Sequence, residues 1–320
     1  MLVAVAWFLV RRAVGAVLLL LGATLLLFVF AKASPTDPLI ARFGISIAGL
    51  SPHDAARLRD QLGLDDPVWQ QYLQFLSDTV AGDFGRSARS GQPVFDLVRG
   101  ALPVTLELAA LAALLAGVVA VVLGTTAAFR KGRTTDRAIT LLSTVWLAAP
   151  SFWLGVLAIE LFAIRLGCVP SGGFVPLSAG VGPWLRALIL PAITLAAAVA
   201  GLLTRVVRSA VLEELGKDYV RTGLAAGVSR RTVLWRNVLP NALGTPLTVF
   251  GLYAGYLLGG AVLVEVVFSL PGLGQLMVNA ATTGDSTVVR AVALVTIALF
   301  LAVNIAVDAF AVALDPRRRA

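Results

Sequence analysis

The sequence predicts an all-α integral membrane protein with six transmembrane helices and a small helical extracytoplasmic insertion after the first helix. Hydrophobic residues make up 58% of the 320-residue chain and charged residues only 14%, whereas soluble proteins carry about 25% charged residues. The mean hydropathy is +0.88. A soluble core cannot absorb this much apolar surface, so lipid is the expected solvent for most of the chain.

Six segments are long and apolar enough to cross the bilayer, which takes about 20 residues. We expect them at 13–31, 102–129, 138–164, 184–203, 243–268 and 291–314. The first segment holds 19 residues without a charge between Arg12 and Lys32. A signal-peptide core has only about 7–15 apolar residues, so we expect this segment to stay as a membrane anchor.

The distribution of basic residues predicts the orientation. With the N-terminus inside and the spans alternating, most of the 26 Lys and Arg residues fall on the inner side, as the positive-inside rule requires. Both termini are therefore expected in the cytoplasm. The net charge of +8 is explained by this asymmetry and by contact with the lipid bilayer, so no nucleic acid is expected as a partner.

Composition excludes several kinds of chemistry. The chain has one His, His53, and one Cys, Cys168, so neither a His/Cys metal site nor a Cys–His nucleophile pair is expected. No G-x-x-x-x-G-K-[ST] motif is present, so the chain does not bind ATP through a P-loop. An intramembrane hydrolase is disfavoured, because only Asp308 lies deep in a span and His53 lies in a loop. We expect no catalytic residue and no metal.

The outer loop, 32–101, has the sequence pattern of helices. Residues 51–54, SPHD, predict an N-cap followed by proline in the first turn. Asp66 and Pro67 precede a second run with helical spacing that includes Trp69, Tyr72 and Phe75. These aromatic residues either hold a ligand or a docking protein, or pack the small domain and the membrane interface; we favour packing.

The inner loop, 205–241, predicts two short helices. Asp218 is expected to cap a helix that runs to Ala226, and Gly227 to supply a left-handed C-cap. Ser229 is expected to start a second helix that ends before Pro240. Four arginines make this a rigid basic structure beneath the membrane: Arg221, Arg230, Arg231 and Arg236. It can rest on anionic headgroups or bind a soluble partner, and the residues alone do not separate these possibilities.

This inner loop resembles the EAA loop of bacterial ABC importer permeases, E-A-A-x-x-x-G followed nine residues later by I-x-L-P. Gly227, nine intervening residues and then 237–240, NVLP, keep that spacing. Residues 221–223, RTG, replace the EAA triplet. Together with 218–222, DYVRT, this departure resembles the peptide-importer branch of the family.

Other motifs extend the resemblance over nearly the whole chain, in the order expected of dipeptide and oligopeptide permeases. They are 82–87 GDFGRS, 90–94 SGQPV, 102–107 LPVTLE, 150–153 PSFW, 170–173 PSGG, Glu265 with 268–274 FSLPGLG, and 315–317 DPR.

The resemblance implies six transmembrane helices of the ABC importer permease type in a bacterial cytoplasmic membrane. The expected domains are an N-terminal transmembrane helix at 1–31, an extracytoplasmic loop domain at 32–101, and a permease core of five transmembrane helices at 102–320 with a cytoplasmic coupling loop at 205–241. The implied partners are a second homologous permease, two cytoplasmic ABC ATPase subunits, an extracytoplasmic solute-binding protein and a peptide substrate. ATP and Mg would bind the ATPases, so no cofactor is expected in this chain. The implied coupling residues are Asp218, Tyr219, Arg221, Thr222, Gly223, Gly227, Ser229, Arg230, Arg231, Arg236 and Pro240.

Polar residues inside the spans are candidates for the transport pathway, because buried charge in a membrane usually faces a cavity or a partner. The candidates are Glu160, Glu265, Asn304 and Asp308, with bonding between helices as the alternative role. Gly251, Gly255 and Gly259 recur every fourth residue and suit close helix packing. Pro150, Pro191 and Pro246 are expected to bend their spans. A stand-alone ion-coupled carrier or channel is the alternative function, but it leaves the EAA-like loop unexplained.

Overall fold

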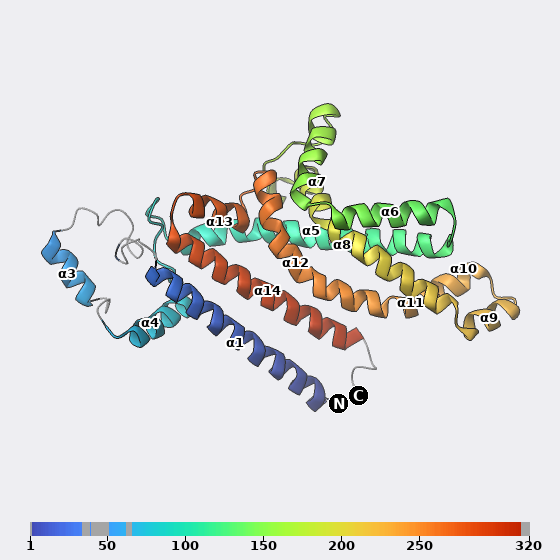
Figure 1. Cartoon of the computed structure of the whole chain (residues 1–320), viewed down its shortest axis with the longest axis horizontal. Helices are drawn as coiled ribbons and strands as arrows, with labels where there is room; N and C mark the ends of the chain where they lie inside the picture. Colours follow the sequence, from blue (N-terminus) through green and yellow to red (C-terminus); the bar gives the residue numbers. More distant parts are fainter. Residues whose placement is uncertain (1, 34–38, 40–50, 62–65, 315–320) are drawn as a thin grey trace. The chain divides into compact units, whose positions relative to one another are not determined.

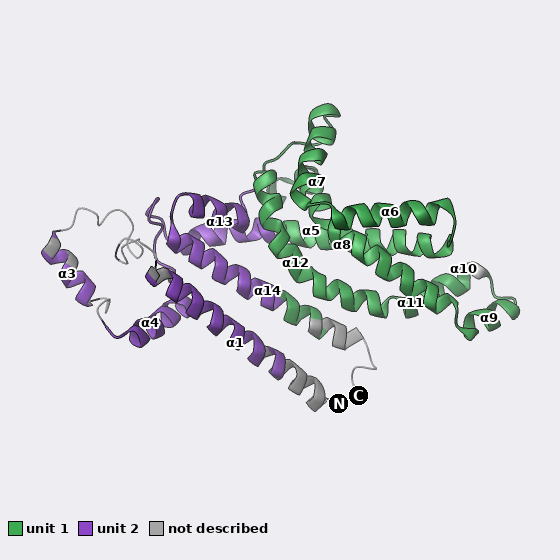
Figure 2. Ribbon diagram, viewed as in Figure 1, with its two compact units in different colours: residues 1–7, 106–269, 303–320 green, residues 8–105, 270–302 purple. Residues whose placement is uncertain are grey.

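A computed structural model describes residues 2–33, 39, 51–61 and 66–314 (Figure 1). These residues are almost wholly helical or connecting, apart from one isolated antiparallel bridge between Arg86 and Pro93. The chain forms two compact units (Figure 2). Unit 1 comprises Met1–Trp7, Leu106–Ser269 and Val303–Ala320, and unit 2 comprises Phe8–Thr105 and Leu270–Ala302.

Four helices of the described chain are long and apolar enough to cross a membrane, and a fifth span is obtained if one bent helix pair counts as a single crossing. The four are α5 (Val94–Phe129), α8 (Val181–Leu215), α12 (Gly244–Val267) and Ser286–Val307 within α14 (Ser286–Leu314). Helix α1 (Leu2–Ala33) contains a shorter apolar stretch, Val14–Phe30. The predicted count of six spans therefore stays a prediction.

The segment expected to form the third span is broken at Pro150. Helix α6 (Thr134–Ala148) and the pair formed by α7 (Ser151–Ala158) and the π-helix η2 (Ile159–Arg165) meet at 110°. Ala149 takes an extended conformation, with ψ 133°, as expected of a residue before proline. The bend predicted at Pro150 is confirmed, and one unbroken helix over 138–164 is excluded.

Pro191 and Pro246 each lie within a helix that continues on both sides of them. Helix α8 continues through Pro191. Pro246 is the third residue of α12, where the missing N–H would have no partner within the helix in any case. The bends predicted at Pro191 and Pro246 stay predictions. Two helices are also longer than predicted: α5 begins at Val94 instead of 102, and α8 runs to Leu215 instead of 203, ending only at Gly216.

Helix α8 is the centre of unit 1, and α6, α7 and α12 all pack against it. Small residues permit the closest approaches. A Cβ atom at Gly201 would lie 2.6 Å from the carbonyl oxygen of Ser143 on α6, and one at Gly124 of α5 would lie 2.7 Å from that of Thr204. Gly124 belongs to a buried stripe of small residues on α5, which recurs every fourth position: Ala112, Ala116, Ala120, Gly124 and Ala128.

The glycine repeat predicted on α12 packs closely at Gly251. Gly251 and Gly255 are buried, and a Cβ atom at Gly251 would overlap Cγ1 of Val307 on α14. Gly259 faces open space, and a Cβ atom added there would meet nothing within 4 Å. A close approach is thus found at Gly251, and close packing at Gly255 and Gly259 stays a prediction.

Unit 2 is built around the first turns of α5. Val94 and Val98 form a buried cluster with Leu273 of α13 (Leu273–Thr282) and Val292 of α14. Two polar contacts close the unit. Ser87 donates to the Asp285 carboxylate over 2.6 Å, and the hydroxyl of Thr105 accepts from the Leu273 N–H over 2.8 Å.

The two helices predicted in the outer loop are confirmed, as α3 (Pro52–Gln61) and α4 (Val68–Ala81). The Ser51 hydroxyl accepts from the Asp54 N–H over 3.2 Å and caps α3. On α4, the rings of Tyr72 and Phe75 lie 5.4 and 5.9 Å from the ring of Phe28 on α1. The packing role favoured for these two aromatic residues is therefore confirmed.

Candidate functional site

The inner loop folds into a helical hairpin at residues 216–243, called the basic hairpin below. It contains α9 (Asp218–Ala225), α10 (Arg230–Thr232), the π-helix η4 (Val233–Val238) and α11 (Leu239–Ala242). Val220 of α9 packs into the hairpin with Val233 and Val238, and each of the three side chains is at most 4% exposed. The two short helices predicted around Gly227 are confirmed.

The turn at Gly227 is defined by two hydrogen bonds. Gly227 has φ +80°, its N–H donates to Leu224 O over 3.1 Å, and the Val228 N–H donates to Gly223 O over 3.1 Å. This pair of bonds is the Schellman motif, in which a left-handed residue ends the helix. The Ser229 hydroxyl then accepts from the Thr232 N–H over 3.1 Å and caps the next helix. The caps predicted at Gly227 and Ser229 are both confirmed.

Two details of the hairpin differ from prediction. Asp218 is the first residue of α9 and makes no side-chain cap, because Lys217 holds the N-cap position; its carboxylate stands in the first turn, where the helix dipole favours it. The second helix continues through Pro240 to Ala242. The Leu239 N–H bonds back to Leu234 O, so π-helical bonding before Pro240 accommodates a residue that has no N–H to donate.

A buried carboxylate fixes the hairpin to α8. Glu214, 6% exposed, accepts from Lys217 Nζ over 2.6 Å and from the Tyr219 hydroxyl over 2.7 Å. The bond to Glu214 raises the pKa of Lys217. Burial, and then the bond to Glu214, raises the pKa of Tyr219. Glu214 thus holds the first turn of α9 against the end of α8. Glu214 was not singled out in the sequence, although its spacing of three residues to Lys217 is a local signal for such a pair.

The outer surface of the hairpin combines charge with apolar area. Most predicted coupling residues lie there and are exposed: Asp218, Tyr219, Arg221, Thr222, Gly227, Ser229, Arg231, Arg236 and Pro240. Gly223 is half-buried against Val233, and the side chain of Arg230 lies outside the described residues. Three large apolar residues share the surface: Leu224, Val228 and Trp235, which are 43%, 42% and 59% exposed.

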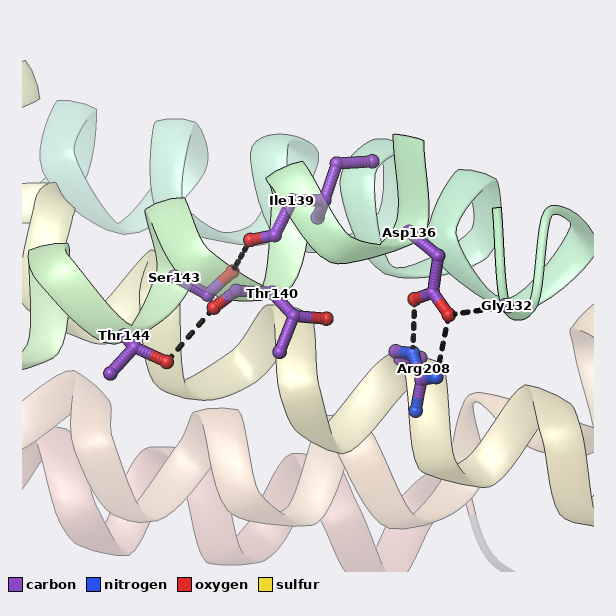
Figure 3. A network of polar contacts seen from close by, with 7 residues as sticks. All are labelled: Gly132, Asp136, Ile139, Thr140, Ser143, Thr144 and Arg208. Atoms are coloured by element: carbon purple, nitrogen blue, oxygen red, sulfur yellow. Dashed lines mark hydrogen bonds and ion pairs between the residues drawn. The ribbon is translucent and has the colours of Figure 1, made fainter. Parts of the chain in front are cut away.

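A second polar contact joins α8 to α6 (Figure 3). Arg208 Nε and Nη2 donate to the two carboxylate oxygens of Asp136 over 2.7 and 2.9 Å. The Gly132 N–H, in the turn before α6, donates to the same carboxylate over 2.9 Å. Asp136 is 4% exposed. Sequence reasoning counted Arg208 only as one of many inner basic residues, and a pair 72 positions apart leaves no local signal.

The pathway candidates occupy different environments. Glu160 pairs with Arg165 over 2.9 Å at an exposed position of η2, whereas Glu265 of α12 is fully buried. Asn304 is half-buried on α14, and the Asp308 side chain lies outside the described residues. Their role in a pathway stays a prediction. In the described part of the chain, no three His, Cys, Asp or Glu residues are grouped to hold a metal ion.

Two motifs that are distant in sequence meet in unit 1. The Gly173 N–H donates to Phe268 O over 3.0 Å, and Gly172 packs against the same carbonyl group. Ser269 has φ +52°, a conformation that is uncommon outside glycine. The strings PSGG and FSLPG therefore have a structural role here, in which two loops hold each other through the backbone.

The membrane-length helices identify a membrane protein with several spans, from which the basic hairpin projects. The chain belongs to the family of binding-protein-dependent transport system inner membrane components, whose family model matches residues 120–320. The N-terminal model of the same system matches residues 5–109. The chain is accordingly a multi-pass membrane permease of the ABC transporter type, not an enzyme.

Two relatives match almost end to end. The chain is 37% identical over 313 residues to the oligopeptide transport system permease protein AppB of Bacillus subtilis, covering 97% of this chain and 98% of the relative. It is 35% identical over 318 residues to the di/tripeptide transport system permease protein DppB of Pseudomonas aeruginosa, covering 93% and 94%.

Proposed function

We propose that this permease imports di- or oligopeptides by an ATP-driven mechanism, forming the translocation pathway with a second homologous permease. Two cytoplasmic ABC ATPase subunits would bind ATP and Mg, and an extracytoplasmic solute-binding protein would deliver the peptide. The names of the two relatives support a peptide substrate. The observation that carries the mechanism is the basic hairpin, which is rigid, exposed and fixed to α8 through Glu214.

The surface of the hairpin favours a protein partner over lipid headgroups. A headgroup contact needs only cations, but Leu224, Val228 and Trp235 expose apolar area among the arginines. Aromatic residues and arginine are the types enriched in protein interfaces, where large apolar groups are desolvated. A soluble ATPase subunit is the partner that accounts for both features.

The contacts of α8 link the basic hairpin to helix α6, so a movement of the hairpin would be transmitted to both helices. Closure of the ATPase pair would displace the basic hairpin, and Glu214 would pass the displacement to α8. The Arg208–Asp136 pair joins α8 to α6, so the two helices would move as one body. Such rigid-body motion between two packing states is how transporters alternate access.

The proposed topology places α1 as the first of six spans, 32–101 outside, and both termini in the cytoplasm of a bacterium. The uncharged segment 13–31 holds 19 residues, within the range of about 17–25 residues for a membrane span. Its side chains expose apolar surface, with Leu18 63% and Leu26 73% exposed, as lipid contact would require. A reporter tag at residue 320 should be accessible from the cytoplasm and one at Gly91 from outside.

Affinity purification of the tagged full-length chain from mild detergent tests the proposal. We expect a second permease and P-loop ATPases to co-purify, and the reconstituted complex to take up peptide only with ATP. A chain that purifies alone and moves solute without an ATPase would contradict the proposal and establish the carrier or channel alternative.

A further inference from the structure

Helix α4 carries an apolar stripe of four residues, of which three are exposed and Leu76 is half-buried. At about 100° per residue, four side chains fall within a sector of about 60°: Trp69, Leu73, Leu76 and Val80. Trp69 is 62% exposed, Leu73 55% and Val80 89%. A helix of 14 residues would be expected to turn such a stripe toward a core if water were its only surroundings.

Helix α4 has two other faces, one that packs on α1 and one that is polar. Tyr72 and Phe75 face α1, where both rings pack on Phe28. The polar face holds Gln70, Gln74, Ser77 and Asp78, with Gln71 beside it. Asp78 is the one charged residue of the helix, and it stands about 170° around the helix from the middle of the apolar stripe. The helix therefore separates a protein-facing sector, a polar sector and an exposed apolar sector.

The contact with α1 sets the depth of the stripe. The Tyr72 hydroxyl donates to Leu21 O over 3.2 Å and lies 3.0 Å from the Thr24 hydroxyl. Both partners belong to the apolar stretch Val14–Phe30. Leu21 lies nine residues before Phe30, which is about 14 Å along a helix axis. A tyrosine side chain reaches only part of that distance, so α4 must lie beside the outward end of the apolar stretch and not beyond it.

The exposed stripe of α4 and the outward half of α1 both present large apolar side chains. Leu25, Leu26 and Val29 are exposed on the same outward half of α1, where a spanning helix contacts acyl chains. Helix α4 has no Lys or Arg that would point to a phosphate or to an acidic protein. Lipid is therefore the occupant that fits both the depth and the chemistry of the stripe.

We propose that α4 lies in the outer leaflet of the bilayer, parallel to its surface, with Trp69, Leu73, Leu76 and Val80 among the lipid acyl chains. This arrangement is that of an interfacial amphipathic helix, and it would anchor the outer loop between α1 and α5. The inference rests on the proposed placement of α1 as a membrane span. Helix α3, PHDAARLRDQ, has no comparable stripe and would remain in water.

Spin labels on single cysteines can test this placement. The chain has one native cysteine, Cys168, which is exposed, so Cys168→Ser provides a cysteine-free background. Leu73→Cys and Val80→Cys report the stripe, Gln74→Cys the polar face, and Leu26→Cys the surface of α1. Each labelled chain is assembled with its co-purified subunits in lipid nanodiscs, and accessibility to oxygen is compared with accessibility to a water-soluble nickel chelate.

We expect labels at 73 and 80 to favour oxygen over the nickel chelate several-fold more than the label at 74, as the label at 26 should also do. Water access at 73 and 80 with lipid access at 26 would overturn the inference and leave the topology intact. Shielding from both reagents at 73 and 80 would also overturn it, since a protein partner would then cover the stripe. Water access at 26 would instead remove the proposed span and the inference with it.

Discussion

Arg208 holds Asp136 through two parallel hydrogen bonds of 2.7 and 2.9 Å, in a pair where the Asp136 side chain is 6% exposed and the Arg208 side chain 27%. The Glu160–Arg165 pair has a similar distance, 2.9 Å, but its side chains are 47% and 70% exposed. These two ion pairs therefore allow a carboxylate–guanidinium contact to be compared at a buried and at an exposed position. Removing one partner of a buried pair leaves a desolvated charge, whereas the side chains of the exposed pair are less enclosed by protein and lose less when one partner is removed.

We expect Asp136→Ala to destabilise unit 1 by about 3 kcal/mol, the low end for a buried pair because Arg208 keeps some solvent contact. Arg165→Ala should cost less than about 1 kcal/mol. Denaturant unfolding in detergent micelles measures both. Arg208→Lys keeps the charge but loses the bidentate geometry, so it should fall between them. Equal costs at the two pairs would show that the Asp136 contact does not fix α6 to α8.

Gly227 is constrained by its backbone alone. Its φ is +80°, and a Cβ atom there would meet nothing within 4 Å. A β-branched residue is destabilised by roughly 1–2 kcal/mol in the left-handed region, while Asn visits it readily. Gly227→Val should therefore reach the membrane but separate ATP hydrolysis from peptide uptake, and Gly227→Asn should keep both. Hydrolysis and uptake are measured on the same proteoliposomes. Normal coupling in the Val variant would rule out a need for this turn geometry.

Replacing Gly223 with alanine is expected to have the opposite effect from a substitution at Gly227. It lies inside α9 with a helical backbone, and a Cβ atom would rest 3.6 Å from Val233 Cγ2, an ordinary contact. Gly223→Ala should stabilise the hairpin by about 0.5–1 kcal/mol, since alanine loses less entropy in a helix. Gly227→Ala should destabilise it. Protease resistance of the hairpin reports both variants, and a shared direction of change would contradict the assigned conformations.

Gly251 and Gly259 offer another matched pair. A Cβ atom at Gly251 would overlap Cγ1 of Val307, whereas one at Gly259 would meet nothing within 4 Å. Gly251→Ala should therefore lower the thermal stability of the detergent-solubilised chain, and Gly259→Ala should leave it unchanged or raise it. Val307→Ala removes the overlapping methyl group and should restore the stability of the Gly251→Ala variant. Failure of this rescue would mean that α12 and α14 do not approach at Gly251.

Local rules predicted the parts of the structure that depend on neighbouring residues. The caps at Ser51, Gly227 and Ser229 follow from side-chain and backbone chemistry within a few positions, and the break at Pro150 follows from a missing N–H. Helix ends without such a signal were misjudged. Helix α8 passes the expected boundary at 203, because polar residues such as Arg205 and Arg208 do not stop a helix.

Long-range pairs were beyond the reach of the sequence. Asp136 with Arg208 and Ser87 with Asp285 join residues 72 and 198 positions apart, and a single sequence carries no signal that selects these partners. The same limit applies to the glycines of α12. Their spacing marks a bare face, but only the position of α14 decides that Gly251 is packed and Gly259 is not.

The contacts of Glu214 predict how the basic hairpin responds to alkali. The pKa of Lys217 is raised from 10.5 and that of Tyr219 from 10.0, so both groups hold their protons more firmly in the folded state. Their stabilisation is fully present below the unfolded values and is lost as the pH rises through the raised ones. The hairpin should therefore be equally protected at about pH 7 and pH 9 and should loosen above about pH 10. Hydrogen exchange of the amides of α9, corrected for intrinsic rates, measures this. Glu214→Gln removes the anionic acceptor and should weaken the alkaline transition, whereas loosening near neutral pH in the unmodified chain would contradict the role of Glu214 as anchor.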